Sequence, residues 1–483
     1  MAMMDSPSGS LWPRQLMSPG ASAQQLMSPV NMTPVAGGLG WPEAGLVLFA
    51  FAAPSAVMAV PYLIGTAGYL GGLLICVVVT GASVGGSMML LRIKLMHQSC
   101  HTFGDLGREV LGRPGQLWGN IIQLGNFCMF LPCALEFCAL ALSGIGKGFS
   151  AFGGCTDYYL FTIALLCLLT TQVRKLSNTV VLTFVSVVSV YSMSLCMLIA
   201  AFSYDNPQKL PAQNFGNPEA DATLQLVKAA GGFTIAAWAY VPSFLTVELV
   251  TCMESPADFR KSLYLSATMN ILMVAVVGVP VVARWGYNVG EVIGITDGVA
   301  AWKPGVAINT FFNTFQLIGN FVSYMLDSVP LGRFCQKAWA PQFGDTWSSA
   351  HMAQYLGYTL PTFILALALA VLVPSVNTLL DFTTALTVPM VTQIYPATLY
   401  WRLFCQSGVP LARESLREHP EGQSDSPDQK TTPMEKCGVL AVFVVGCTSF
   451  VVCMIKAVGF LALEELRPPM QIGCGDWTIW SSR

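Results

Sequence analysis

Long apolar segments recur along this chain, and short polar segments separate them. A run of about 20 apolar residues can cross a bilayer as one helix, and we count about eleven such runs. Their approximate centres are Ala53, Val79, Met129, Leu165, Val188, Ala239, Val274, Phe321, Leu367, Met390 and Phe450. The pattern predicts an all-α polytopic membrane protein whose main surroundings are the lipid bilayer.

Two of these apolar runs contain proline near their middle. The first, Gly45–Ile64, carries Pro54-Ser55-Ala56, and the sixth, Ala229–Met253, carries Val241-Pro242. Proline removes a backbone donor and clashes with the preceding helical turn, so we expect both helices to break there. Paired broken helices at matching places of two halves are the sequence indication of a transporter's midplane binding site. The alternative is that Pro54 and Pro242 only kink packed helices.

The polar segments predict the domain organisation. Residues 1–40 are rich in Ser, Pro, Gln and Met, which predicts a disordered cytoplasmic tail and a possible site for a regulatory partner. Residues 41–405 would form a ten-helix core, 406–436 a disordered cytoplasmic loop, 437–462 an eleventh helix and 463–483 a non-cytoplasmic tail. Lys and Arg gather in alternate short loops, for example at Arg92, Lys94, Arg108 and Arg113, which places the N-terminus in the cytoplasm.

Composition agrees with this interpretation. Of 483 residues, 54% are hydrophobic and only 10% are charged, whereas soluble proteins carry about 25% charged residues. The net charge of −2 gives no basic surface for nucleic acid. Most of the 15 cysteines lie within apolar runs, where thiols pack as small hydrophobic groups. We expect no metal site and no cofactor.

Several short motifs resemble those of one transporter family. They are Ala59-Val60-Pro61-Tyr62, Gly68-Tyr69-Leu70-Gly71, Met253-Glu254-Ser255-Pro256-Ala257-Asp258-Phe259, Val329-Pro330-Leu331 and Tyr395-Pro396. In this order and spacing they resemble the amino acid/auxin permease family, within the amino acid–polyamine–organocation superfamily. The resemblance covers roughly Gly45 to Phe460.

The resemblance implies a five-plus-five inverted repeat with broken helices one and six, followed by an eleventh helix. It also implies amino acid transport, usually driven by protons or sodium. Two positions depart from the family pattern. The family's Gly-x-Gly in the first helix is replaced by Pro54-Ser55-Ala56, and its Gly-Gly in the sixth by Val241-Pro242. Both replacements leave less room beside the backbone.

An amino acid carries two charges, and broken helices can bind both. The N–H groups of Ser55, Ala56 and Val57 would meet a carboxylate at a positive helix end. Carbonyl groups freed near the second break would meet the ammonium group, and aromatic faces would also attract it. The predicted substrate-binding residues are Pro54, Ser55, Ala56, Val57, Trp238, Tyr240, Val241, Pro242, Ser243 and Phe244.

Carboxylates inside apolar runs are candidates for ion coupling, because charge in the bilayer core is costly. Glu136 and Glu248 are the candidate proton carriers. We expect Asp327 to form an interfacial salt bridge with Arg333 and Asp381 to lie near the outer surface. Sodium is the less favoured alternative, and its ligands would come from the eighth helix. The oxygens there are those of Asn313, Thr314, Asn320 and Ser323.

The sequence therefore predicts a secondary active transporter of amino acids, with proton coupling favoured over sodium. An amino-acid sensor of the same fold, a carrier of related small amines and a sodium symporter are the alternatives. An enzyme is not expected: Gly81-Ala82-Ser83-Val84-Gly85 matches a serine-hydrolase pattern, but all four histidines lie in loops or at helix ends. The membrane would be the plasma membrane or that of an organelle such as a vacuole or lysosome.

Overall fold

The computed structural model describes residues 38–148, 156–173, 179–203, 213–215, 222–287, 289, 307–339, 349–373, 376–406 and 431–462. Its first half contains α1 Trp41–Ala67, α2 Tyr69–Met96, α3 Phe103–Leu111, α4 Arg113–Gly148, α5 Thr156–Thr170, α6 Val180–Ser203, α7 Ala222–Trp238 and α8 Ser243–Cys252. Its second half contains the 3₁₀ turn η3 Pro256–Asp258, α9 Phe259–Met273, η4 Val274–Gly278, α10 Val279–Trp285, α11 Ala307–Trp339, α12 Ser349–Leu372, α13 Val376–Leu386, η5 Met390–Ile394, α14 Tyr395–Tyr400, η6 Trp401–Gln406 and α15 Pro433–Ala462.

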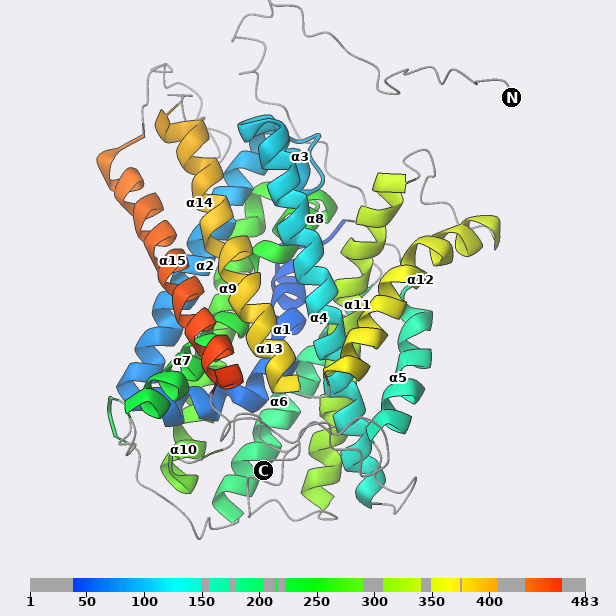
Figure 1. The fold of residues 1–483 in the computed structure, drawn as a ribbon, viewed down its shortest axis with the longest axis vertical. Helices are drawn as coiled ribbons and strands as arrows, with labels where there is room; N and C mark the ends of the chain where they lie inside the picture. Colours follow the sequence, from blue (N-terminus) through cyan, green and yellow to red (C-terminus); the bar gives the residue numbers. More distant parts are fainter. Residues whose placement is uncertain are drawn as a thin grey trace, which may run out of the picture.

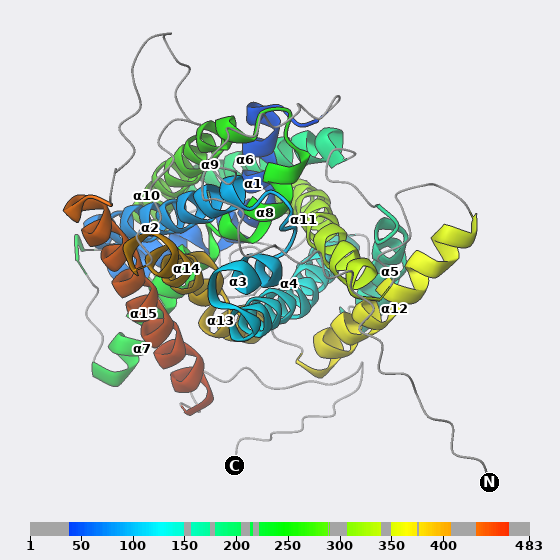
Figure 2. The same cartoon turned by 90° about the horizontal axis from the view of Figure 1, so that it is seen from above.

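The helices form one bundle around α1 (Figures 1 and 2). Almost all of α1 is buried, including both of its internal prolines, Pro54 and Pro61. In the view from above, α15 and α12 lie at opposite ends of the bundle. The described residues form no strand apart from a single backbone bridge between Leu39 and Met253. The all-α prediction is confirmed.

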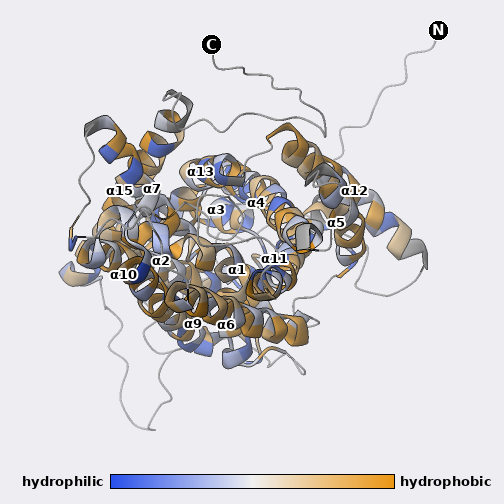
Figure 3. Ribbon diagram, turned by 90° about the horizontal axis from the view of Figure 1, so that it is seen from below, coloured by the Kyte–Doolittle hydropathy of each residue, from blue (hydrophilic) through white to orange (hydrophobic). Residues whose placement is uncertain are grey.

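Much of the ribbon of the outer helices has the colour of hydrophobic residues (Figure 3), and large apolar side chains of these helices are exposed. Leu169 of α5 is 70% exposed and Val181 of α6 is 75% exposed, which in a membrane places them against lipid. Eight described helical stretches are long and apolar enough to cross a bilayer. α5, α11 and the α13–α14 stretch run alongside them in Figure 1. The count of eleven spans and the inverted repeat stay predictions.

The predicted break at Pro54 is wrong, because α1 is one continuous helix from Trp41 to Ala67. Proline still removes one helical hydrogen bond here, the one that the carbonyl of Ala50 would accept. Hydroxyl groups bind neighbouring carbonyls of the same turn: Ser55 donates to Ala52 at 3.0 Å, and Ser323 of α11 donates to Phe51. Such side-chain donors allow proline within membrane helices.

The predicted break in the sixth apolar run is confirmed. α7 ends at Trp238 and α8 begins at Ser243, so residues 239–242 are not helical. Pro242 stands directly before α8 and cannot donate a helical hydrogen bond. The carbonyl of Pro242 accepts a bond from the hydroxyl of Thr246 at 2.9 Å.

The predicted disordered tail, most of the 406–436 loop and the C-terminal tail lie outside the described residues. Within the described part, the chain ahead of α1 binds the chain after α8. The N–H of Leu39 donates to Cys252 at 2.8 Å, and the N–H of Glu254 donates to Leu39 at 3.0 Å. These two bonds tie the start of α1 to the end of α8.

Candidate functional site

The break between α7 and α8 lies directly against the proline turn of α1. The indole Nε1 of Trp238 donates a hydrogen bond of 2.9 Å to the hydroxyl of Ser55. Trp238 is the last residue of α7, and both side chains are buried. The structure therefore brings together the two proline-bearing segments that the sequence singled out, although only one of them is broken.

Aromatic rings fill the space around this hydrogen bond. The rings of Phe130 and Trp238 stack with centroids 4.1 Å apart, and Phe51 stacks on Phe130 at 4.9 Å. Phe244, the second residue of α8, meets Phe51 at 5.4 Å and Phe127 at 4.5 Å. We call Phe51, Phe127, Phe130, Trp238 and Phe244 the aromatic cluster. It closes the site in this conformation, where we had expected the two segments to face each other across a polar gap.

Ser243 begins α8 and links it to two other helices. Its hydroxyl lies 2.8 Å from the hydroxyl of Ser87 on α2 and donates to the carbonyl of Thr392 at 3.3 Å. Thr392 lies in η5, a π-helical turn, and such turns are frequent at functional sites. The α2 backbone comes close here because Gly86 has no side chain; a Cβ on it would lie 1.9 Å from the Thr392 oxygen.

The hydroxyl of Tyr240 binds α9. That hydroxyl donates to the carbonyl of Leu263 at 3.0 Å and lies 2.8 Å from the hydroxyl of Ser266, both on α9. Tyr240 therefore anchors the non-helical segment to α9. The part that Pro54–Val57 and Tyr240–Phe244 play in binding a substrate stays a prediction.

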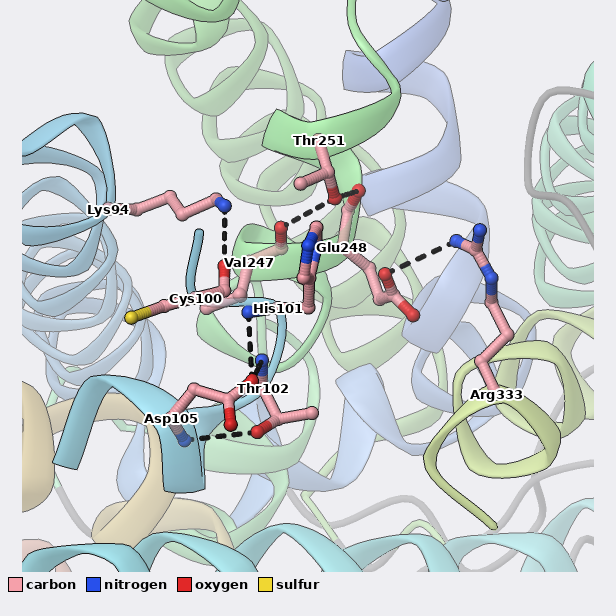
Figure 4. Close-up of polar contacts among 9 residues, drawn as sticks. All are labelled: Lys94, Cys100, His101, Thr102, Asp105, Val247, Glu248, Thr251 and Arg333. Atoms are coloured by element: carbon pink, nitrogen blue, oxygen red, sulfur yellow. Dashed lines mark hydrogen bonds and ion pairs between the residues drawn. The ribbon is translucent and has the colours of Figure 1, made fainter. Parts of the chain in front are cut away.

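A salt bridge connects α8 to α11 beyond the aromatic cluster (Figure 4). Nη1 of Arg333 lies 3.4 Å from Oε2 of Glu248. The side chain of Glu248 is 8% exposed and that of Arg333 is 20% exposed. The expected pairing of Arg333 with Asp327 is wrong. Arg333 therefore engages Glu248 on α8 and not a carboxyl group of its own helix.

The segment between α2 and α3 lies near this salt bridge in Figure 4. The ammonium group of Lys94 donates to the carbonyl of Cys100, and Asp105 and Thr102 cap the start of α3 with reciprocal bonds of 3.0 Å. Burial, together with the charges of Asp105 and Glu109, raises the pKa of the Cys100 thiol to about 11. These contacts hold the segment in place beside α8.

The other buried carboxyl groups have different surroundings. Asp381 is buried, contrary to our expectation, and its Oδ2 lies 3.7 Å from Nζ of Lys456 on α15. Glu136 on α4 and Asp327 on α11 are also buried. No hydrogen bond reaches Oε1 of Glu136 or either carboxyl oxygen of Asp327 within the described chain.

The oxygen atoms considered for sodium differ in their surroundings. Oδ1 of Asn313 and Oδ1 of Asn320 are buried and have no hydrogen-bond partner among the described residues. The hydroxyl of Ser323 donates to the carbonyl of Phe51, and that of Thr314 donates to Thr310 at 2.8 Å. The amide nitrogens of Asn313 and Asn320 donate to carbonyls one turn earlier in α11, at 2.8 and 3.0 Å.

Sequence reasoning missed Phe51, Phe127, Phe130 and Lys456. The three phenylalanines look like ordinary core residues, and only their contacts with Trp238 or Phe244 single them out. Lys456 did carry a signal, because a lysine inside the last apolar run is costly unless it has a partner.

Comparison with known proteins assigns the family. The profile of the family described as "Transmembrane amino acid transporter protein" matches residues 37–414, most of the chain. A protein named "Transmembrane transporter" from Gibberella moniliformis (strain M3125 / FGSC 7600) is 24% identical over 172 residues. That match spans only 35% of this chain and 35% of the relative.

Among solved structures, one similar fold is that of Mhp1, a nucleobase-cation-symport-1 family transporter, in a closed conformation with bromovinylhydantoin bound. The TM-score is 0.51 at 13% sequence identity, and the match covers 91% of this chain and 98% of Mhp1. At this identity the likeness concerns the fold alone. It agrees with a multi-pass membrane transporter built of helices.

Proposed function

The chain belongs to the family of transmembrane amino acid transporter proteins, and we propose that it is a secondary active transporter that carries amino acids across its membrane. The observation that carries this proposal is the contact between the broken α7–α8 junction and the proline turn of α1. The Ser55–Trp238 hydrogen bond lies inside the bundle and is shielded by aromatic rings. A broken helix at this depth is tolerated where it is buried or lines a cavity.

The groups at this junction suit a zwitterion. The carbonyls of Val241 and Pro242 accept bonds from the N–H of Phe244 and the hydroxyl of Thr246, so we assign the ammonium group to the carbonyls of Ala239 and Tyr240. The indole N–H of Trp238 and the hydroxyl of Ser55 are donors that can turn toward a carboxylate. Because α1 is continuous, its N–H groups at residues 55–57 are not the carboxylate site in this conformation. In the closed conformation, Trp238 occupies the place that we assign to the substrate.

The buried carboxyl groups favour the proton over sodium as the coupling ion. Glu136 has no cationic partner among the described residues, whereas Glu248 is paired with Arg333. A buried carboxyl group without a partner is stable as the neutral acid and can release its proton when the surroundings change. For sodium, the oxygens of Ser323 and Phe51 are engaged with each other.

Uptake of radiolabelled amino acids by proteoliposomes tests the proposal. The wild-type protein should accumulate at least one amino acid when the outside is acidic. Trp238→Phe keeps the ring and removes the N–H donor, so it should weaken apparent affinity while the protein folds normally. Trp285→Phe is the matched control, because Trp285 is equally buried but lies at the end of α10.

The outcomes separate the alternatives. Uptake of small amines and not of amino acids would overturn the substrate class. Amino acid binding without any uptake or exchange would identify a sensor. Loss of uptake on sodium removal at a constant proton gradient would identify a sodium symporter.

A further inference from the structure

Among the residues that the structure describes, four carboxyl groups are buried between the membrane helices. Two of them have a cationic partner there, and two do not. Glu248 pairs with Arg333, and Asp381 pairs with Lys456. Glu136 and Asp327 remain. We propose that Asp327 and Glu136 together form the proton-binding site of this transporter, at the interface of α4 and α11. This inference rests on the proposed function and assigns its coupling site.

Asp327 has the stronger claim of the two. Asp327 is 0% exposed, and neither of its carboxyl oxygens has a hydrogen-bond partner in the described part of the chain. Moving an ionised carboxylate out of water without a partner costs several kcal/mol, about as much as a protein domain's whole stability. Asp327 is therefore the group to which we first assign the proton.

Glu136 lies on α4, which packs along α11. It is buried, and its Oε1 has no hydrogen-bond partner in the described part of the chain. Glu136 is therefore the second carboxyl group at this interface to which we assign proton binding.

The helices packed around the pair bring no free cation to it. On α11 itself, Arg333 lies six residues beyond Asp327 and is bound to Glu248. α4 and α5 contribute thiols near this region, those of Cys133, Cys138 and Cys167. α12 contributes the phenol of Tyr355, and α13 contributes Asp381, which Lys456 engages. α6 has no charged residue, and α1 has none after Glu43.

Hydroxyl groups lie beside Asp327 and connect it to a small cavity. Tyr324 precedes Asp327 by three residues and so lies on the same face of α11. Its hydroxyl is buried without a hydrogen-bond partner, and its side chain lines a cavity together with Ser328, Thr171 and Thr359. The cavity supplies a polar path along which a proton reaches the buried pair.

A metal ion fits this place less well than a proton. A hard cation binds several oxygen ligands at once. Two nearby serine hydroxyls of α11 donate to backbone carbonyls: Ser323 donates to Phe51, and Ser328 donates to Met325 at 2.9 Å. One proton needs only a single carboxyl oxygen.

Transport measurements test the coupling role. Asp327→Asn imitates the neutral acid with almost the same shape, so it should keep amino acid exchange at equal pH on both sides. It should lose accumulation driven by an acidic outside, and its uptake should no longer vary with pH. Glu136→Gln should likewise keep exchange, and its accumulation and pH dependence should be reduced to a smaller degree. Asp258→Asn, which changes an exposed carboxyl group before α9, is the control and should behave as wild type.

Infrared spectroscopy of the purified protein tests the proton itself without any transport. The wild type at neutral pH should show the carbonyl band of a protonated carboxylic acid, and the double variant Asp327→Asn with Glu136→Gln should lose that band. If the asparagine variant does not fold, Asp327→Glu keeps the titratable group and should shift the midpoint of the pH profile instead.

These results show separately whether the assignment of the coupling site or the proposed function is wrong. A wild-type pH profile in Asp327→Asn and Glu136→Gln, or an unchanged carboxylic acid band, overturns the assignment of the site. An Asp327→Asn variant that still accumulates substrate under a proton gradient does the same. A wild-type protein that transports no amino acid overturns the proposed function, whereas the infrared band would still support the proton site.

Discussion

Replacing Lys456 with methionine tests how the last helix is held against the rest of the bundle. Nζ of Lys456 lies 3.7 Å from Oδ2 of Asp381, and the two side chains are 2% and 1% exposed. The stem of the lysine packs beside the backbone of Gly231 on α7, where an added Cβ would lie 3.3 Å from Cε. Methionine keeps this packing and removes only the charge.

Two independent estimates of the stability lost in Lys456→Met agree. Opposite charges about 4 Å apart at an effective dielectric constant of about 20 attract each other by about 4 kcal/mol. After the change, Asp381 can remain buried by taking up a proton. That costs about 4 kcal/mol at pH 7, because aspartic acid in water loses its proton near pH 3.9 and each pH unit corresponds to about 1.4 kcal/mol. We therefore expect Lys456→Met to lower the free energy of unfolding by about 3–4 kcal/mol.

Unfolding in mixed detergent micelles with increasing dodecyl sulfate measures this change. The double variant Lys456→Met with Asp381→Asn has no unpaired charge and should recover most of the loss. Lys436→Met, at an exposed position of the same helix, is the matched control and should have little effect. The loss should also fall to about 1.5 kcal/mol at pH 5, where protonating an aspartate costs less. A loss below about 1 kcal/mol, or one that the double variant does not relieve, would refute the reasoning.

Four further outcomes are expected. Glu248→Gln removes the salt bridge that ties α8 to α11; losing a partly exposed pair worth about 1 kcal/mol should make separation of the two helices about fivefold more frequent and so speed substrate efflux. Exchanging the residues as Glu248→Arg with Arg333→Glu should reverse the effect, and unchanged efflux would mean that the pair does not hold the two helices together. Gly86→Ala should destabilise the protein by about 1–3 kcal/mol in the same unfolding assay, since its Cβ would lie 1.9 Å from the Thr392 oxygen, whereas Gly81→Ala meets open space. In a variant that keeps only Cys100, maleimide labelling at pH 7 should be about a hundredfold slower than for an ordinary thiol, because the raised pKa leaves little thiolate. Epitope tags should be read inside at the N-terminus and outside at the C-terminus; a protected C-terminal tag would mean an even number of spans.

Local chemistry sufficed to predict the break after Trp238. Pro242 cannot donate, and the residue before a proline avoids helical geometry, so Val241-Pro242 favours a break in the helix. The continuity of α1 could not be predicted in the same way. The carbonyl of Phe51, in the proline turn, is bound by the hydroxyl of Ser323, which lies 272 residues further along the chain. Only the folded arrangement supplies that donor.

The buried charges illustrate the same limit. Asp327 and Arg333 are close in sequence, but six residues turn a helix by about 240°, so they point to different sides of α11. Arg333 instead meets Glu248, and Asp327 is left among thiols and hydroxyls. The apolar runs did predict that each of these carboxyl groups would be buried. Which of them has a cation could be learned only from the packing of α4, α8, α11 and α15.

The contrast between the continuous α1 and the broken α7–α8 segment indicates where the protein can move. Opening α1 at Pro54 would expose carbonyl groups that Ser55 and Ser323 now satisfy. Residues 239–242 have already given up helical bonds, so a change of their backbone angles costs less. Trp238 lies immediately before them and blocks the site by its bond to Ser55. A rotation at this segment that withdraws Trp238 would admit a substrate while α1 keeps its helical bonds, so the tryptophan at the end of α7 is where the closed site should open first.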